Sequence, residues 1–200
     1  MAVDTSRPIS AADSESLQEY GAMLRSRRSV NFFKPEPVSR ELLLEAVEVA
    51  RWAPNHRLTE PWHFYLLGGK TMRDIVELIV ELKTRGRDEA ARDAVRGRLQ
   101  AIPTWFVQTC RLTPGMPVQE QEDYAACACA IQNLMLYLWR AGIGVKWTTG
   151  EATREQRFYD LLGIDSGQER VTGLFWCGYP ADVPAARKRR ETDDICTTLP

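Results

Sequence analysis

Apolar residues in the first half of the chain recur at helical spacing in two places and form a short unbroken run in a third. Spacings of three and four residues predict amphipathic helices, and Ser39, a residue type that caps helix starts, precedes the second helix. The unbroken run is aromatic and ends in two glycines, which favours a strand. The expected elements are helix 14–26, a helix from Ser39 that ends before Pro54, strand 62–67, helix 71–83, and a charged segment, 84–100, that is either a solvated helix or a mobile excursion.

The longest apolar pattern, 119–141, lies in the second half of the chain and is dense in alanine and cysteine. It is apolar on nearly every side, so the helix that it predicts should be buried all round. Small side chains let another backbone come close, so this helix is either the centre of the core or part of a subunit interface. The remaining pattern predicts strands at 104–112, 145–149 and 170–177, and a short helix at 153–162 that begins at Thr153.

The alternation of strands and helices favours an α+β or α/β domain built on one central sheet. The chain of 200 residues is long enough for one domain with a sound core. We expect this single domain to occupy 15–200, after a flexible polar arm at 1–14. The proline-containing C-terminal end is expected to form an extended tail that wraps a partner.

Composition narrows the function classes. Hydrophobic residues make up 44% of the chain and charged residues 26%, which is ordinary for a globular protein, and the net charge of −1 gives no overall field for nucleic acid or an anionic membrane. No stretch approaches the roughly 20 apolar residues that span a bilayer, and the polar start lacks the apolar core of a secretory signal. Five cysteines, an odd count with no Cys-x-x-Cys pair, indicate a reduced, cytoplasmic protein with structural thiols.

Standard catalytic and nucleotide-binding motifs are absent from the sequence. It contains no Gly-x-Gly-x-x-Gly, Walker loop or Gly-x-Ser-x-Gly elbow. The two histidines, His56 and His63, are too few for a histidine-rich metal site. If the chain is an enzyme, a bound cofactor is therefore expected to carry the chemistry.

Two basic clusters stand far apart in the sequence. Arg27-Arg28-Ser29 offers two planar guanidinium groups and a hydroxyl, which suit bidentate recognition of a phosphate. The ordinary alternative is that arginine at a helix C-terminus balances the helix dipole. The second cluster, 187–190, is Arg-Lys-Arg-Arg; such a run is usually solvated, and the acidic residues just after it weaken any nucleic-acid interpretation. Together the two clusters would grip one phosphate.

Two further segments combine polar side chains with constrained turns. A short loop, 54–61, has proline at both ends and carries His56, and such loops hold polar groups in fixed positions at a site. The alternative is a rigid connector with a surface histidine. The run 147–150, Trp-Thr-Thr-Gly, lies at a strand end, where two hydroxyls would suit a ring edge or a phosphate. A β-branched strand entering a turn is the plainer explanation.

Taken in order, these segments resemble the nitroreductase family of FMN-dependent oxidoreductases, and most of all its compact bacterial subgroup. The family fold is an α+β three-layer sandwich with a central, mostly antiparallel sheet flanked by helices. It exists as an intertwined homodimer with two FMN sites at the interface. The resemblance covers about 16–195, and its matching segments are 27–30, 37–39, 50–54, 61–64, 142–150 and 173–180 with its basic tail.

The resemblance assigns phosphate-binding roles to both basic clusters. Arg27 and Ser29 match family contacts to the FMN phosphate and ribityl chain, with Arg28 beside the ring. Lys188 and Arg190 match the C-terminal cationic pair that closes on the phosphate.

It also assigns contacts to the flavin ring. His56 matches a loop position that faces the flavin of the partner subunit. Trp147, Thr148 and Thr149 match a strand end that touches the cofactor.

Two positions depart from the family pattern. Many members carry lysine or arginine near flavin N1 and O2 where this chain has Asn31, and a neutral donor stabilises an anionic reduced flavin less than a cation does. Many members have glutamine where this chain has Glu60, which cannot donate a hydrogen bond when ionised.

The resemblance implies a two-step reaction. NAD(P)H passes hydride to flavin N5, and a nitroaromatic, quinone or activated alkene is then reduced in the same place. The protein needs no acid or base of its own, because the flavin carries the electrons. The alternatives are a flavin store or redox sensor without turnover, and a related flavoenzyme that dehalogenates or fragments its substrate. NADH and NADPH are equally compatible with the sequence.

Overall fold

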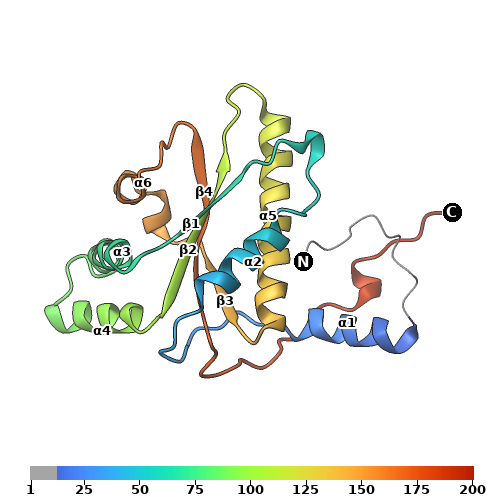
Figure 1. Cartoon of the computed structure of the whole chain (residues 1–200), viewed down its shortest axis with the longest axis horizontal. Coiled ribbons are helices and arrows are strands. Elements are labelled where there is room, and N and C mark those ends of the chain that lie inside the picture. The colour runs from blue at the N-terminus through green and yellow to red at the C-terminus, as the bar shows by residue number, and fades with distance from the viewer. Residues whose placement is uncertain (1–12) are drawn as a thin grey trace.

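The computed structural model describes residues 13–200, and it forms an α+β three-layer sandwich (Figure 1). The flexible arm expected at 1–14 falls outside the described residues as far as residue 12. The central sheet has four strands in the order β1-β2-β4-β3, and every neighbouring pair is antiparallel. The strands are β1 (Trp62–Leu66), β2 (Thr104–Arg111), β3 (Gly144–Thr148) and β4 (Glu169–Gly178).

Helices cover both faces of this sheet (Figure 1). Alternate side chains of β2 and β4 point to opposite faces, as the pleat requires. Phe106 and Phe175 stack at 4.6 Å on one face, and Trp105 and Trp176 meet at 5.7 Å on the other. The first face packs on α2 (Arg40–Ala50) and α5 (Pro117–Arg140), and the second on α3 (Gly69–Lys83), α4 (Glu89–Gln100) and α6 (Gln156–Leu162).

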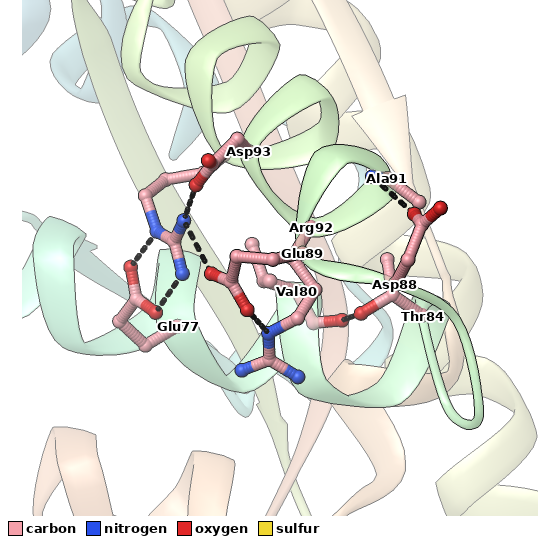
Figure 2. A network of polar contacts seen from close by, with 9 residues as sticks. Glu77, Val80, Thr84, Asp88, Glu89, Ala91, Arg92 and Asp93 are labelled. Atoms are coloured by element: carbon pink, nitrogen blue, oxygen red, sulfur yellow. Dashed lines mark hydrogen bonds and ion pairs between the residues drawn. The ribbon is translucent and has the colours of Figure 1, made fainter.

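Most of the charged segment 84–100 is an ordered helix, α4, which begins at Glu89 after a turn at 84–86. The helix is therefore the correct one of the two expectations for this segment. Asp88 caps α4 by accepting a hydrogen bond from the Ala91 amide at 2.9 Å. Arg96 reaches across to Glu77 on α3 at 2.8 Å, within the polar network of Figure 2. Exposed ion pairs of this kind stabilise little by themselves. The buried Leu99, three residues after Arg96 on the same side of α4, supplies the apolar contact that holds α4 on the core.

The expectation that the long helix is buried all round is wrong for the single chain. α5 buries one side against the sheet and α2. Ala125, Cys129 and Gln132 on its other side are exposed. Composition alone does not separate a helix buried in a core from one that is half buried and half covered by another subunit.

The short helix near the end also begins later than expected. A 3₁₀ turn occupies Glu151–Arg154, and α6 starts at Gln156. Thr153 donates its hydroxyl to the carbonyl of Gly150 at 2.8 Å, so it closes the preceding turn instead of starting the helix.

The helix at the start of the described chain, α1 (Ser14–Ser26), has the predicted bounds. Asp13 caps it by accepting from the Ser16 amide at 2.7 Å. None of its residues is buried, and Leu17 is 63% exposed. α1 projects from the sandwich beside the C-terminal segment 181–200 (Figure 1). Its apolar face is therefore uncovered in the single chain.

The segment 27–34 runs along the open edge of β3. Ser29 forms an isolated parallel bridge with Val145. Gly144 permits this approach, because a Cβ at that position would lie 2.4 Å from Val30 Cγ2, closer than real Cβ atoms come. The edge of the sheet thus holds the first basic cluster in place. Across the residues that the structure describes, no helix is both long enough and apolar enough to cross a membrane.

Candidate functional site

A cavity of about 630 Å³ lies between the C-terminal end of α1 and the C-terminal segment. Two stretches that are distant in the sequence line it, and arginine is the commonest residue among them. Among residues 13–200, no acidic side chain is part of this lining. We call it the cation pocket; its lining residues are Leu24, Arg25, Arg27, Arg28, Ser29, Asn31, Pro184, Ala185, Ala186, Arg187 and Arg189.

Arg27 is the least satisfied side chain of this pocket. Its Nη1 atom is buried and has no hydrogen-bond partner among the described residues. Burial lowers the pKa of the Arg27 guanidinium, and the positive charges of Arg28 and Arg189 lower the pKa further. A partly buried guanidinium beside two others is costly unless an anion joins them. The chemistry of the donor set therefore fits a phosphate group.

Arg28 and Ser29 come directly after Arg27 in the sequence. Arg28 donates from Nη1 to the carbonyls of Arg25 at 2.6 Å and Arg27 at 2.9 Å. It thus caps the C-terminal end of α1, which is the ordinary alternative considered for arginine at this place. Ser29 stays exposed at the pocket wall. Within the first cluster, Arg27 is the guanidinium left free for a ligand.

The C-terminal cluster presents a different pair of cations from the one that the resemblance implied. Arg187 and Arg189 line the pocket. Lys188 is 87% exposed and pairs with Glu191 at 3.4 Å, and Arg190 is also absent from the described lining. Alternate side chains of an extended chain point to opposite sides, so one register cannot bring both pairs to the same wall. The role assigned to Lys188 and Arg190 stays a prediction.

Most polar groups at the end of β3 are hydrogen-bonded to neighbouring residues of the same chain. Trp147 donates from Nε1 to the carbonyl of Thr172 at 3.0 Å, and Thr148 donates from Oγ1 to that of Leu174 at 2.9 Å. The carbonyl of Thr149 accepts from Arg154 at 3.0 Å. None of the three lines the cation pocket; Thr148 lines a second cavity of about 180 Å³. The Trp147 and Thr148 side chains thus fix the strand end.

Asn31 links the cation pocket to the second cavity. Its Oδ1 accepts a hydrogen bond from Lys146 Nζ at 2.7 Å. Lys146 belongs to the lining of the second cavity and lies 4.9 Å from the Trp176 ring. Our sequence analysis missed Lys146. Strand alternation would have placed it on the same face as Thr148, but did not reveal what that face meets.

The His56 loop lies elsewhere. His56 Nδ1 is 2.9 Å from Glu122 Oε2, close to the N-terminal end of α5. The cation pocket lies near the opposite end, where Trp139 donates to Ser26 Oγ at 2.8 Å. Figure 1 shows α1 beside this end of α5. Glu122 and Trp139 are roughly 25 Å apart along the helix, at 1.5 Å per residue. A single chain does not bring His56 to the pocket.

The same loop carries backbone strain. Arg57, Leu58 and Glu60 have positive φ angles of 62°, 49° and 44°, a region that non-glycine residues seldom adopt. Asn55 stabilises the loop by accepting from the Glu60 amide at 2.7 Å. Strain of this kind persists only where surrounding contacts fix it, and it is frequent at binding sites.

A model of the nitroreductase family matches residues 24–179, most of the chain. This chain belongs to the nitroreductase family. "Putative NAD(P)H nitroreductase YfhC" of Bacillus subtilis is 30% identical over 188 residues, which are 88% of this chain and 92% of that protein.

Solved structures share the nitroreductase fold. A nitroreductase-like family protein from Bacillus cereus superposes with a TM-score of 0.81 at 26% identity, covering 96% of this chain and 99% of that one. An FMN complex from Desulfovibrio desulfuricans superposes with a TM-score of 0.70 at 20% identity, covering 94% and 99%. The match supports the α+β sandwich that the sequence predicted.

Proposed function

We propose that this nitroreductase-family chain is an FMN-dependent oxidoreductase that takes hydride from NAD(P)H and reduces a small organic oxidant. One observation carries the proposal: among the described residues, the buried Nη1 of Arg27 has no partner and lies in a pocket lined by several arginines and by no acidic side chain. The name of the Bacillus subtilis relative and the FMN complex from Desulfovibrio desulfuricans agree with this cofactor and donor.

The cation pocket would hold the phosphate of FMN. Arg27, Arg187 and Arg189 would supply charge-assisted hydrogen bonds, and the Ser29 hydroxyl would donate one more. FMN, when bound, supplies the hydride and electron chemistry that the side chains lack. Because the phosphate is remote from the reacting ring, these residues anchor and orient the cofactor.

The remaining site residues would shape the ring end. The neutral amide of Asn31 lies at the wall of the cation pocket, and the strand end at Thr148 and Thr149 is fixed by hydrogen bonds to its neighbours. A fixed strand end would hold a ring without rearrangement during the reaction. No side chain is assigned a proton-transfer step.

We further propose that the active form is a homodimer. The exposed face of α5, with Ala125 and Cys129, and the uncovered apolar face of α1 need a partner. A two-fold axis across α5 pairs the two copies of the helix antiparallel. This brings the partner subunit's His56 loop to the end of α5 where the cation pocket lies. Each site would then draw on both chains.

A cytoplasmic location is part of the same proposal. All five cysteines are free thiols, which is typical of a reducing compartment.

The test is an absorbance spectrum of the purified protein, followed by anaerobic addition of NADH and, separately, NADPH. A yellow protein that bleaches with either donor is the expected result, and the faster donor identifies the preference. A yellow protein that stays oxidised with both would favour the flavin store or redox sensor. A colourless protein that cannot be reconstituted with FMN would contradict the proposal.

A further inference from the structure

Lys146 is a partly buried cation that the proposed cofactor site has not yet used. It stands on β3, the edge strand beside the first basic cluster. None of the ion pairs found among residues 13–200 involves it. Its only hydrogen bond in that part of the chain goes to Asn31 Oδ1. Its charge is thus available to whatever lies next to Asn31.

The hydrogen bond fixes how the Asn31 amide is turned. A lysine ammonium has donors and no acceptor, so the atom that faces Nζ must be the carbonyl oxygen of the amide. The NH₂ group of Asn31 then points away from Lys146, and no described residue accepts from it. Since Asn31 lines the cation pocket, the free donors of this amide are available to a ligand there.

The surroundings make the Lys146 charge costly and therefore responsive to a nearby anion. Burial lowers the pKa of Lys146, and the charges of Lys83 and Arg98 lower it further. The one carboxylate among the described lining residues of the second cavity, that of Glu151, is paired with Arg85 at 3.0 Å. The field around Lys146 is thus positive, and an added negative charge would relieve it.

We propose that Lys146 is a positioning residue for the flavin, which orients and polarises the Asn31 amide and so supplies through it the positive charge that position 31 itself lacks. This inference rests on the proposed function. The negative charge that FMN gains on reduction would be stabilised by the polarised amide and by the ammonium behind it. The positive charge that many family members carry at position 31 is then supplied by Lys146 on the neighbouring strand β3.

The experiment measures the midpoint potential of bound FMN and its dissociation constant in the full-length protein. Lys146→Met should leave the affinity for oxidised FMN within about threefold, because that form lacks the added ring charge. It should weaken the reduced form relative to the oxidised form about tenfold, which lowers the two-electron potential by about 30 mV. Lys146→Arg, which keeps the positive charge, should leave the potential close to that of the wild-type protein.

Three further variants separate an effect transmitted through Asn31 from a general electrostatic field. Lys83→Met removes another cation of the second cavity that does not contact Asn31, and should change the potential by less than half as much. The double variant Asn31→Lys with Lys146→Met returns the charge to position 31 and should recover the wild-type potential. Asn31→Ala should reproduce the Lys146→Met shift, and the two should not add.

Each outcome decides something. A Lys146→Met protein that binds FMN at the wild-type potential overturns the inference and leaves the proposed function standing. Equal shifts from Lys83→Met and Lys146→Met also overturn it, because the effect would then be a general field. A wild-type protein that binds no FMN overturns the proposed function and this inference with it.

Discussion

The two ends of α5 carry the two halves of the proposed site, and they differ in how their polar groups are satisfied. At the C-terminal end, Arg27 presents a buried donor with no partner among residues 13–200. At the N-terminal end, the loop 54–61 is bonded within itself and to α5, through Asn55, Thr59 and Asp123. The first end is incomplete without an anion. The polar groups of the second end are already hydrogen-bonded, so this end can contact another surface as it stands.

In the proposed site, this difference indicates which end would bind the cofactor and which end the partner subunit would bring to it. An unpartnered guanidinium in a basic pocket gains most of its stabilisation when a phosphate arrives. A strained loop whose amide is held by Asn55 keeps its shape whether or not a ligand is present. The separation of the two along α5 makes the second subunit necessary in the proposed site.

The largest expected effect concerns the incomplete end. Arg27→Ala together with Arg189→Ala should weaken FMN binding about 1000-fold, because each guanidinium contributes a charge-assisted hydrogen bond of about 1.5–3 kcal/mol. Fluorescence quenching of FMN measures the dissociation constant. Lys188→Ala with Arg190→Ala is the matched control, with the same charge removed from the outward-facing positions, and should cost less than about tenfold. A control pair that weakens binding as much would favour the register implied by the resemblance.

The next effect concerns the proposed dimer interface, which would bring the loop 54–61 of the partner subunit to the cation pocket. Ala125→Arg places an unpaired charge on the exposed face of α5 and should raise the dimer dissociation constant about 100-fold. Analytical ultracentrifugation measures it, and bound FMN should fall in parallel. Ala94→Arg on α4 is the control, an exposed alanine on a helix outside the proposed interface. An Ala125→Arg protein that stays dimeric and keeps its FMN would refute the α5 interface.

A smaller effect tests the edge that holds the first cluster. Gly144→Ala forces a Cβ against Val30, so the free energy of unfolding should fall by about 1–3 kcal/mol. FMN affinity should fall with it, because the segment 27–34 must shift. Urea denaturation followed by circular dichroism measures the stability. Gly150→Ala, where a Cβ meets no atom within 4 Å, should change it by less than about 0.5 kcal/mol. Equal losses in both variants would show that the Val30 contact is not the cause.

The smallest effect concerns the loop 54–61 at the N-terminal end of α5. Glu122→Gln removes the charge beside His56 but keeps an acceptor, and the His56 and Glu122 side chains are 59% and 35% exposed, so stability should change by less than about 1 kcal/mol. The Michaelis constant for the oxidant should rise a few-fold if the partner subunit's His56 faces the site. Steady-state kinetics with a quinone provide the measurement. A large loss of stability with unchanged kinetics would mean that the ion pair only holds the loop.

The sequence predicted the strands and most helix bounds because these follow from local periodicity and from a cap such as Ser39. Periodicity left α+β and α/β open, and the resemblance implied the α+β sandwich. It did not predict the exposure of Ala125 and Cys129, because the same small apolar residues suit a core and an interface. The start of α6 at Gln156 was missed because Thr153, the expected first residue, belongs to the preceding 3₁₀ turn and donates its hydroxyl to the Gly150 carbonyl.

The candidate site was located from the sequence more accurately than its individual contacts. Both basic clusters meet at one pocket, as charge and resemblance implied. Which residues of the second cluster face inward depends on the register of a chain with no regular structure, and periodicity cannot supply that. Lys146 escaped notice because its importance comes from a contact with Asn31, far away in the sequence.

The central claim is that the cation pocket binds the phosphate of FMN, and a titration of the apoprotein with FMN and with riboflavin tests it most directly. The two ligands share the ring and ribityl chain and differ in the phosphate. The account predicts that FMN binds at least about 100-fold more tightly than riboflavin and that Arg27→Ala with Arg189→Ala removes most of this difference. Equal affinities for the two ligands in the wild-type protein would contradict it.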